Sequence, residues 1–214
     1  FNCMNTHFIT SFCSIKNGQV NINHSIPFSE PETQPAVDFL KSVYKHYQLN
    51  YPKFYKMDNL CKLAFITSEL LLKTNPFTGK YKADEIAIIA CNSTSSLDID
   101  EEHQLSITDK SNYFPSPAAF VYTLPNILIA EIAIKHGIKG ENAFFICEAF
   151  NPVFMSEYVN SLLDTGKASC CITGWVDFYK GNYRAFLYTV EKQSGILPYG
   201  HTAEALEKLF LHQS

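Results

Sequence analysis

The sequence predicts an α/β domain built on a mixed β-sheet, and two patterns carry this prediction. Through the middle of the chain, short apolar runs typical of strands alternate with longer segments whose apolar residues recur at helical spacing. Near both ends, two strand-like runs follow each other directly, around Asn17-Gly18 and around Lys180-Gly181-Asn182. Such hairpins are antiparallel, so the sheet is not expected to be purely parallel.

The chain opens with a predicted β-hairpin. Residues 7–22 alternate between apolar and polar on either side of Asn17-Gly18, a dipeptide favoured in two-residue hairpin turns. The polar, proline-containing stretch 25–35 is expected to be a loop. Residues 36–47 then carry apolar side chains on one stripe, which predicts an amphipathic helix.

A stronger helix signal covers residues 57–73. Asp58 can cap the first turn, leucines recur at helical spacing, and Thr74-Asn75-Pro76 ends the pattern. The run EIAIIAC at 85–91 is continuously apolar, which predicts a strand covered on both faces. The polar segment 92–109 is expected to be a loop, and its clustered carboxylates suggest either a divalent-metal site or simply a solvated surface. These carboxylates are Asp98, Asp100, Glu101 and Glu102.

The next segments predict a helix, a strand and a second helix. Residues 125–136 have a proline in their first position and a glycine just past their end. Only Glu131 and Lys135 interrupt their apolar character, so we expect this helix to be buried between layers. Residues 143–147 predict a short strand, and Asn151-Pro152 supply the N-cap and first-turn proline of a helix that runs to residue 165.

The chain is expected to close with two strands and a helix, all within one domain. Residues 168–179 and 183–190 are the predicted strands, and residues 202–212 the predicted helix. The 214 residues are 46% hydrophobic, with 17 Phe and 12 Tyr, which is enough to form the core of a single domain over 1–214.

Charge and hydropathy exclude several classes of partner. The net charge is −4 and basic residues are scattered, so nucleic acid is not an expected partner. The longest apolar run, 127–134, is interrupted by Glu131 and is too short to cross a bilayer, so no membrane insertion is expected. The sequence begins at Phe1, and no charged-then-apolar leader follows. A cytoplasmic protein is the expectation.

The seven cysteines do not form a metal-binding pattern. They include no C-x-x-C pair, and no histidine is suitably spaced from the adjacent pair Cys170-Cys171. We expect reduced and mostly buried thiols, with no metal and no cofactor.

Four stretches, in this order, resemble one known family: MDNLCKLAFITSELLL, SPAAFVYTLPNILIAEIAIKHGIKG, AFFICEAFNP and LLDTGKASCCITGWVDF. Together they resemble the N-terminal half of a β-ketoacyl synthase, one of the thiolase-like condensing enzymes, and the resemblance is strongest over 57–178. It implies half of a thiolase-like fold, with a mixed sheet of five strands and helices on both faces.

The resemblance also locates the nucleophile position of the family. Active members carry a cysteine on the turn between a strand and a helix, where the helix N-terminus favours the thiolate. Counting forward from Gly140 or backward from Gly166-Lys167 places Ala149 at this position. Alanine cannot accept an acyl chain, so no catalytic residue is expected. Cys147 lies two positions earlier and is interpreted as a buried strand residue, with a relocated nucleophile as the alternative.

The histidines give no sign of a second catalytic group. The family takes its two catalytic histidines from the second half of a duplicated fold, and the resemblance covers only the first. His136, at the end of a predicted helix, is expected to interact with the helix dipole. His201 flanks the last helix, and the others are expected at the surface or in loops: His7, His24, His46, His103 and His212.

Half of a thiolase-like fold would leave apolar helices without one of their covers. Either the predicted helix 202–212 covers that face, or another chain does. In the family, the strand before the nucleophile pairs with its counterpart in a dimer. Here that strand is AFFICE. Its residues fit such an interface and an interior strand equally well, and the resemblance favours the interface.

The resemblance therefore implies a non-catalytic partner of a ketosynthase, of the chain-length-factor type found in aryl-polyene and related type II fatty acid or polyketide systems. The partner's cysteine would perform the condensation on acyl carrier protein thioesters, and a homodimer is also possible. This chain would line the acyl tunnel with aromatic side chains, the candidates being Phe120, Tyr122, Phe144, Phe145, Phe150 and Phe154. One alternative is a divergent ketosynthase or acyltransferase that uses Cys147, and another is an acyl-binding scaffold without a partner.

Overall fold

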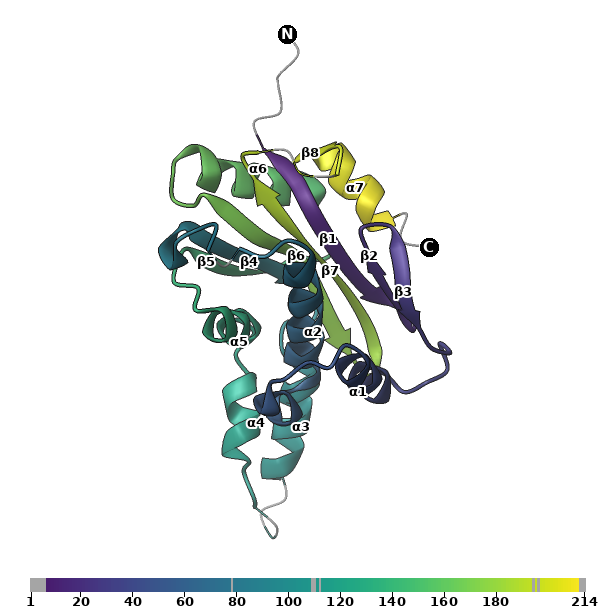
Figure 1. Ribbon diagram of the computed structural model, residues 1–214. Helices are drawn as coiled ribbons and strands as arrows, with labels where there is room; N and C mark the ends of the chain where they lie inside the picture. The colour runs from purple at the N-terminus through teal and green to yellow at the C-terminus, as the bar shows by residue number, and fades with distance from the viewer. Residues whose placement is uncertain are drawn as a thin grey trace.

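A computed structural model describes residues 7–77, 79–108, 111, 113–193, 195 and 197–211. Over these residues the strands form one sheet in the order β3-β2-β1-β7-β6-β4-β5, and β8 pairs with β1 (Figure 1). The strands are β1 (Phe8–Lys16), β2 (Gln19–Ile22), β3 (Ser25–Ser29), β4 (Ile86–Asn92), β5 (Asn142–Ile146), β6 (Cys170–Tyr179), β7 (Asn182–Glu191) and β8 (Tyr199–Gly200).

The sheet is mixed, as the sequence predicts. β4 runs parallel to both β5 and β6, whereas β7 is antiparallel to β6 and β1. These five strands run from β5 at one edge of the sheet to β1, and β2, β3 and β8 extend the sheet beyond β1. The turn between β1 and β2 has positive φ at both Asn17 (48°) and Gly18 (70°), which is the geometry expected of the Asn-Gly hairpin.

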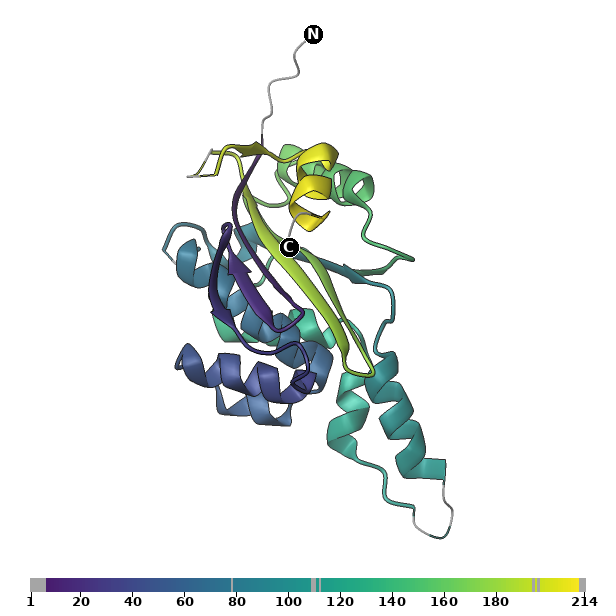
Figure 2. The same ribbon diagram turned by 90° about the vertical axis from the view of Figure 1, so that its right-hand side faces the viewer.

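Helices cover both faces of the sheet (Figures 1 and 2). One face packs against α1, α2 and α5, forming what we call the first core, and the other packs against α6 and α7, forming the second core. The helices are α1 (Ala36–His46), α2 (Asn59–Thr74), α3 (Leu97–Thr108), α4 (Pro117–Tyr122), α5 (Ile127–His136), α6 (Pro152–Asp164) and α7 (Ala203–Leu211), with short 3₁₀ helices η1 (Pro52–Lys56) and η2 (Ala83–Glu85).

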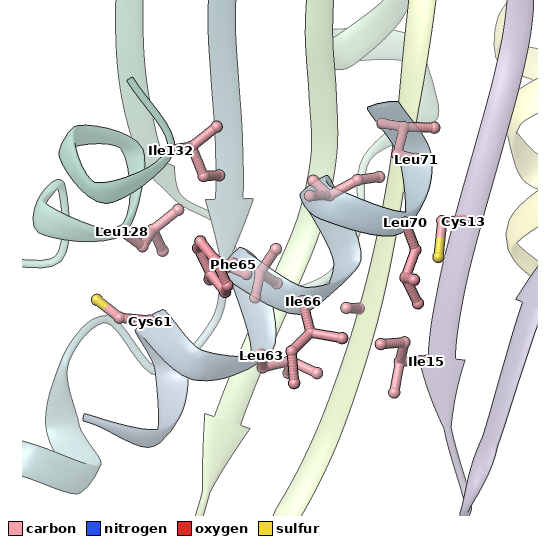
Figure 3. Close-up of a cluster of buried hydrophobic side chains, with 14 of the residues drawn as sticks. Cys13, Ile15, Cys61, Leu63, Phe65, Ile66, Leu70, Leu71, Leu128 and Ile132 are labelled. Atoms are coloured by element: carbon pink, nitrogen blue, oxygen red, sulfur yellow. The ribbon is translucent and has the colours of Figure 1, made fainter. Parts of the chain in front are cut away.

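The first core is centred on α2, which lies beside α5 on the same face of the sheet (Figure 3). Its leucines point toward Cys13 and Ile15 of β1, while Phe65 lies near Leu128 of α5 (Figure 3). The predicted N-cap is confirmed, because the Cys61 backbone N–H donates to the Asp58 carboxylate at 3.0 Å. Polar groups within the helix are satisfied locally, as where the Thr67 hydroxyl donates to the Leu63 carbonyl at 2.7 Å. The helix can therefore be buried on nearly all sides.

The second core is closed by the last helix. α7 packs against α6, and its Leu206 and Leu209 are buried there with Met155 and Val159 of α6. Of the two covers considered for this face, the chain's own C-terminal helix is the one that the structure shows. His212, at the end of the predicted helix, lies outside the described residues.

Two segments expected to be loops contain regular structure. The stretch 25–35 includes β3, whose mostly exposed side chains and Pro27 obscure the strand pattern. The segment 92–109 contains α3, in which only Ile99 is buried, so it has no apolar stripe to detect. Asp109 lies outside the described residues.

Two of the clustered carboxylates of α3 bind the neighbouring hairpin. The backbone N–H of Lys180 donates to Asp98 at 2.8 Å, and the Tyr179 hydroxyl donates to Glu101 at 2.7 Å. Within the described part of the chain, no group of three or more metal-ligating side chains is found. No helix in that part is long and apolar enough to cross a membrane.

His7 and His201 are buried, which corrects the expectation of a surface position for His7. His7 lies 3.3 Å from the Asp164 carboxylate, and His201 Nδ1 lies 2.7 Å from the Asn160 side-chain oxygen. The two histidines join the N-terminal strand, α6 and the start of α7. Burial, and then the proximity of His7, lower the pKa of His201 to about 3.

The protein should lose stability as the pH falls. Because the folded state lowers the pKa of His201, only the unfolded chain takes up the proton between pH 6.5 and pH 3, which favours unfolding. Going from pH 7 to pH 5 should cost about 2 kcal/mol through this residue. Urea unfolding at both pH values should show a smaller loss in His201→Gln and an unchanged loss in the exposed control His46→Gln. An equal loss in wild type and His201→Gln would refute this assignment.

Gly174 is required where β6 meets β7. Its φ is +145°, and a Cβ there would lie 1.9 Å from the Phe186 carbonyl oxygen. Gly174→Ala should therefore destabilise the protein by about 3 kcal/mol or more. Gly181 also has a positive φ, but no atom lies within 4 Å of the position that an added methyl group would take. Gly181→Ala should cost only about 1 kcal/mol, and similar midpoints for the two variants in chemical unfolding would contradict the steric explanation.

Candidate functional site

β5 is an edge strand of the sheet, pairing only with β4 among the described residues. The Cys147 N–H donates to the Asn92 carbonyl at 2.8 Å, and the Glu141 carbonyl accepts from Ile88 at 2.9 Å. Backbone groups alternate in direction along a strand, so Asn142, Phe144 and Ile146 present theirs to the open edge. The alternative of an interior strand is therefore wrong.

Apolar side chains flank this open edge on both faces of the sheet. Phe144 packs toward the first core, and Phe145 toward the second. Ile146 is 61% exposed, and Ile134 on α5 is 65% exposed. The expectation that this helix is buried between layers is wrong on this side. Between α5 and the start of β5 lies a cleft of about 410 Å³, lined by residues that include Ala130, Ile134 and Asn142.

The turn from β5 to α6 positions Ala149 in solvent. Asn151 caps α6 through a hydrogen bond from the Phe154 N–H, at 3.0 Å, and Pro152 occupies the first turn. Ala149 is exposed just before this helix N-terminus, where the partial positive charge would favour a thiolate. An alanine methyl has no atom that could act as a nucleophile or a base.

Cys147 directly follows β5 and continues its pairing with β4, two residues before Ala149. Its half-buried side chain packs against the second core. The other described cysteines are free and buried: Cys13, Cys61, Cys91, Cys170 and Cys171. Cys3 lies outside the described residues. Cys147 is thus the most accessible described thiol, but it does not occupy the position that the turn presents.

Phe150 fills the space behind the turn. Its ring centroid lies 4.4 Å from that of Phe210 on α7, 5.9 Å from Phe186 and 6.4 Å from Trp175. The guanidinium of Arg184 covers the other side of this cluster, 3.5 Å from the Phe210 ring centroid. The helix that closes the second core therefore also packs directly against the turn.

A second aromatic group lies where α6 meets β5. The ring centroids of Phe145 and Phe154 are 4.9 Å apart, and those of Phe145 and Tyr158 are 5.0 Å apart. All three side chains are half-buried. They form an apolar shoulder on the α6 side of the open edge.

Phe120 and Tyr122 lie apart from the turn, on α4. This helix packs against α3 in an arm that extends away from the sheet (Figure 1). Phe120 is 63% exposed, whereas Tyr122 is buried and its hydroxyl donates to Glu131 at 3.2 Å. Burial, with nearby Glu131, raises the pKa of Tyr122 well above its usual value. Glu131 also pairs with Lys53 at 2.7 Å, not with Lys135.

The structure adds a loop that the sequence patterns do not single out. β4 ends next to the turn, and the following Ser93 and Thr94 bind the Asp177 carboxylate of β6. The Ser93 hydroxyl donates to it at 2.8 Å, the Thr94 hydroxyl at 2.7 Å and the Thr94 N–H at 3.1 Å. These contacts fix the carboxyl ends of β4 and β6, which is where open α/β sheets form their sites. In the sequence, the one signal for Ser93 and Thr94 is that they directly follow a predicted buried strand.

No protein-family model matches the sequence, and no curated protein matches it significantly. The structure is similar to that of the ishigamide ketosynthase/chain length factor, with a TM-score of 0.62 and 15% identity over 91% of this chain and 64% of that one. It is also similar to a chain of the complex of the ketosynthase ApeO with its chain length factor ApeC from Xenorhabdus doucetiae, with a TM-score of 0.57 and 13% identity over 89% and 80% of the two chains.

A third similar structure is AntDE:AntF, a type II polyketide synthase acyl-carrier protein in complex with its ketosynthase, with a TM-score of 0.63 and 12% identity over 95% of this chain and 65% of that one. The chain thus spans somewhat less than two thirds of the matched chains in the first and third cases. It has the thiolase-like fold of ketosynthases and chain length factors, which confirms the resemblance at the level of the fold.

A cysteine introduced at the turn should be far more reactive than Cys147. In a Cys3→Ser background, which removes the one undescribed thiol, Ala149→Cys should react with DTNB at close to the rate of a free thiol. Cys147 should react at least about tenfold more slowly, because its side chain is half-buried. Combining Ala149→Cys with Cys147→Ser gives the rate of the new thiol alone, and the Cys3→Ser background without Ala149→Cys gives the rate of Cys147. Faster labelling of Cys147 than of the new thiol would contradict the placement of both residues.

Proposed function

We propose that this chain is a non-catalytic subunit of the chain-length-factor type. It pairs through β5 with a catalytic β-ketoacyl-acyl carrier protein synthase and forms part of the wall of that subunit's acyl tunnel in fatty acid, aryl-polyene or polyketide synthesis. The observation that carries the proposal is an open apolar edge strand followed by a turn on which exposed Ala149 precedes the N-terminus of α6.

The open edge supports pairing with another chain. The outward backbone groups of Asn142, Phe144 and Ile146 can each exchange hydrogen bonds with an added strand. Exposed apolar side chains lie on both sides of that edge, Ile134 on α5 and Val153 on α6. A partner strand would satisfy the backbone, and its flanking helices would cover these side chains. A second copy of this chain could meet the same requirement, so a homodimer is the competing assembly.

The turn supports a division of labour between the subunits. The partner's cysteine would receive the acyl chain and perform the decarboxylative condensation, and the acyl carrier protein would approach through the complex. This chain would contribute wall residues near the shared edge: Phe144, Phe145, Phe150 and Phe154. A tunnel role for Phe120 and Tyr122 would require the arm to reach the partner, since neither lies beside the turn in this chain.

A second candidate function is a divergent ketosynthase or acyltransferase that uses Cys147. The observation in its favour is that Cys147 is half-buried, whereas the other described thiols are fully buried. Its position in the β4–β5 pairing does not place it at the helix N-terminus, where the turn would activate it.

Co-expression with a candidate catalytic ketosynthase from the same organism tests the proposal. We expect a one-to-one complex by size-exclusion chromatography, with condensation activity that is unchanged in Cys147→Ala. Phe144→Pro removes an outward N–H without breaking a bond to β4, so it should weaken the complex at least about tenfold, whereas Phe144→Leu should leave it nearly intact. Activity of the isolated chain that disappears in Cys147→Ala would favour the second candidate. A stable homodimer that does not bind the co-expressed ketosynthase would refute the heterodimer.

A further inference from the structure

The two edges of the sheet differ in their ability to accept another strand. β3, at one edge, contains Pro27, which has no N–H to donate to a neighbouring strand. β5, at the other edge, presents the N–H and C=O groups of Asn142, Phe144 and Ile146. An added strand can therefore pair fully with β5, whereas β3 lacks a donor in the middle of the strand.

A second copy of β5 fits this open edge in one register better than in any other. Two identical strands related by a two-fold axis are antiparallel. With Phe144 of both copies on the axis, Asn142 of each copy lies opposite Ile146 of the other. All three outward residues then exchange backbone hydrogen bonds with one another, whereas a shift of the register pairs one of them beyond the end of β5.

In this register an exposed isoleucine lies next to an apolar cleft. Ile146 is 61% exposed and lies on the same face of β5 as Phe144, which is the face that carries α5. Opposite it lies Asn142 of the second copy. Asn142 lines the cleft of about 410 Å³ together with apolar residues of α5, among them Ala130 and Ile134. Each copy thus places an isoleucine beside the apolar cleft of the other.

The charges at the two ends of the strand match as well. Glu148, just after β5, is exposed, and the exposed Lys139, just before β5, lines the same cleft. Neither side chain forms an ion pair within the residues that the structure describes. In the register centred on Phe144, Glu148 of one copy lies opposite Gly140 of the other and so next to Lys139. The two-fold axis repeats this pair of opposite charges at the other end.

We propose that, without a ketosynthase, this chain forms a two-fold dimer through β5. Ile146 of each copy covers the α5 cleft of the other, and Glu148 pairs with Lys139 at both ends. The backbone edge, the cleft and the charges are each self-complementary, as the interface of a two-fold dimer must be. The dimer shares the β5 edge with the proposed function but does not depend on it, because no ketosynthase takes part. It would keep the edge covered until a ketosynthase replaces one copy.

Charge reversal tests the register. Size-exclusion chromatography with light scattering should give about twice the 24.2 kDa of one chain at high micromolar concentration. Lys139→Glu and Glu148→Lys should each weaken the dimer at least about tenfold, because like charges then meet at both ends. An equimolar mixture of the two variants should recover the dimer, since each supplies the charge that the other lacks. Lys45→Glu changes an exposed lysine on α1 and should leave the dimer intact.

The cleft is tested by a substitution that a single copy should tolerate. Ile146→Asn should weaken the dimer at least about tenfold, because two isoleucines lose their apolar cover. It should leave the urea unfolding of dilute protein unchanged, since the side chain is exposed in one copy. Ile26→Asn alters an isoleucine of the opposite edge strand that is 47% exposed, and it should retain the dimer. A monomer at high micromolar concentration, or a dimer insensitive to both Lys139→Glu and Ile146→Asn, would overturn the proposal.

Addition of the candidate ketosynthase separates this proposal from the proposed function. A dimer that exchanges one copy for the ketosynthase supports both. A dimer that persists unchanged beside the ketosynthase supports the self-pairing and contradicts the heterodimer. A chain that is monomeric alone but binds the ketosynthase overturns the dimer and leaves the proposed function standing.

Discussion

The structure depends on β4, a strand whose seven residues are all buried. Such a strand needs a neighbour on each edge and a helical layer on each face, because its backbone and its side chains are both removed from water. β5 and β6 satisfy its edges, while α2 and α5 cover one face and α6 the other. Its last residue, Asn92, accepts the Cys147 N–H and so fixes the level at which β5 ends. The turn that carries Ala149 is therefore positioned by the most buried element of the sheet.

The helical layers on the two faces of the sheet are shielded from solvent to different extents. On the second face, α7 returns and buries Leu206 and Leu209 against α6, which is worth about 1.5–3 kcal/mol for each side chain. On the first face, nothing in the described chain covers the outer side of α5, where Ile134 is exposed beside the open edge of β5. An unpaired backbone and an uncovered apolar side chain therefore coincide at one place. A partner strand with its own flanking helix would satisfy both at once.

Sequence patterns predicted the elements whose signals are local. The Asp58 and Asn151 caps, the Asn17-Gly18 turn and the apolar run of β4 each depend on a few neighbouring residues, and each is confirmed. The patterns failed for α3, which has almost no buried side, and for His7, whose burial depends on residues distant in sequence, such as Asp164 at the end of α6 and His201. The edge position of β5 could not be predicted either. Its apolar sequence fits an interior strand as well, and only the order of strands in the sheet distinguishes the two.

The turn that carries Ala149 lacks a nucleophile, and aromatic side chains pack behind it. Phe150 stacks on Phe210, and Arg184 closes that cluster from the other side. Both rings pack against the second core, so opening a channel between them would expose that core. Restoring a cysteine alone would therefore supply a reactive group next to a filled core. Under the proposed function, this aromatic cluster would form part of the filled wall that the chain presents to its partner.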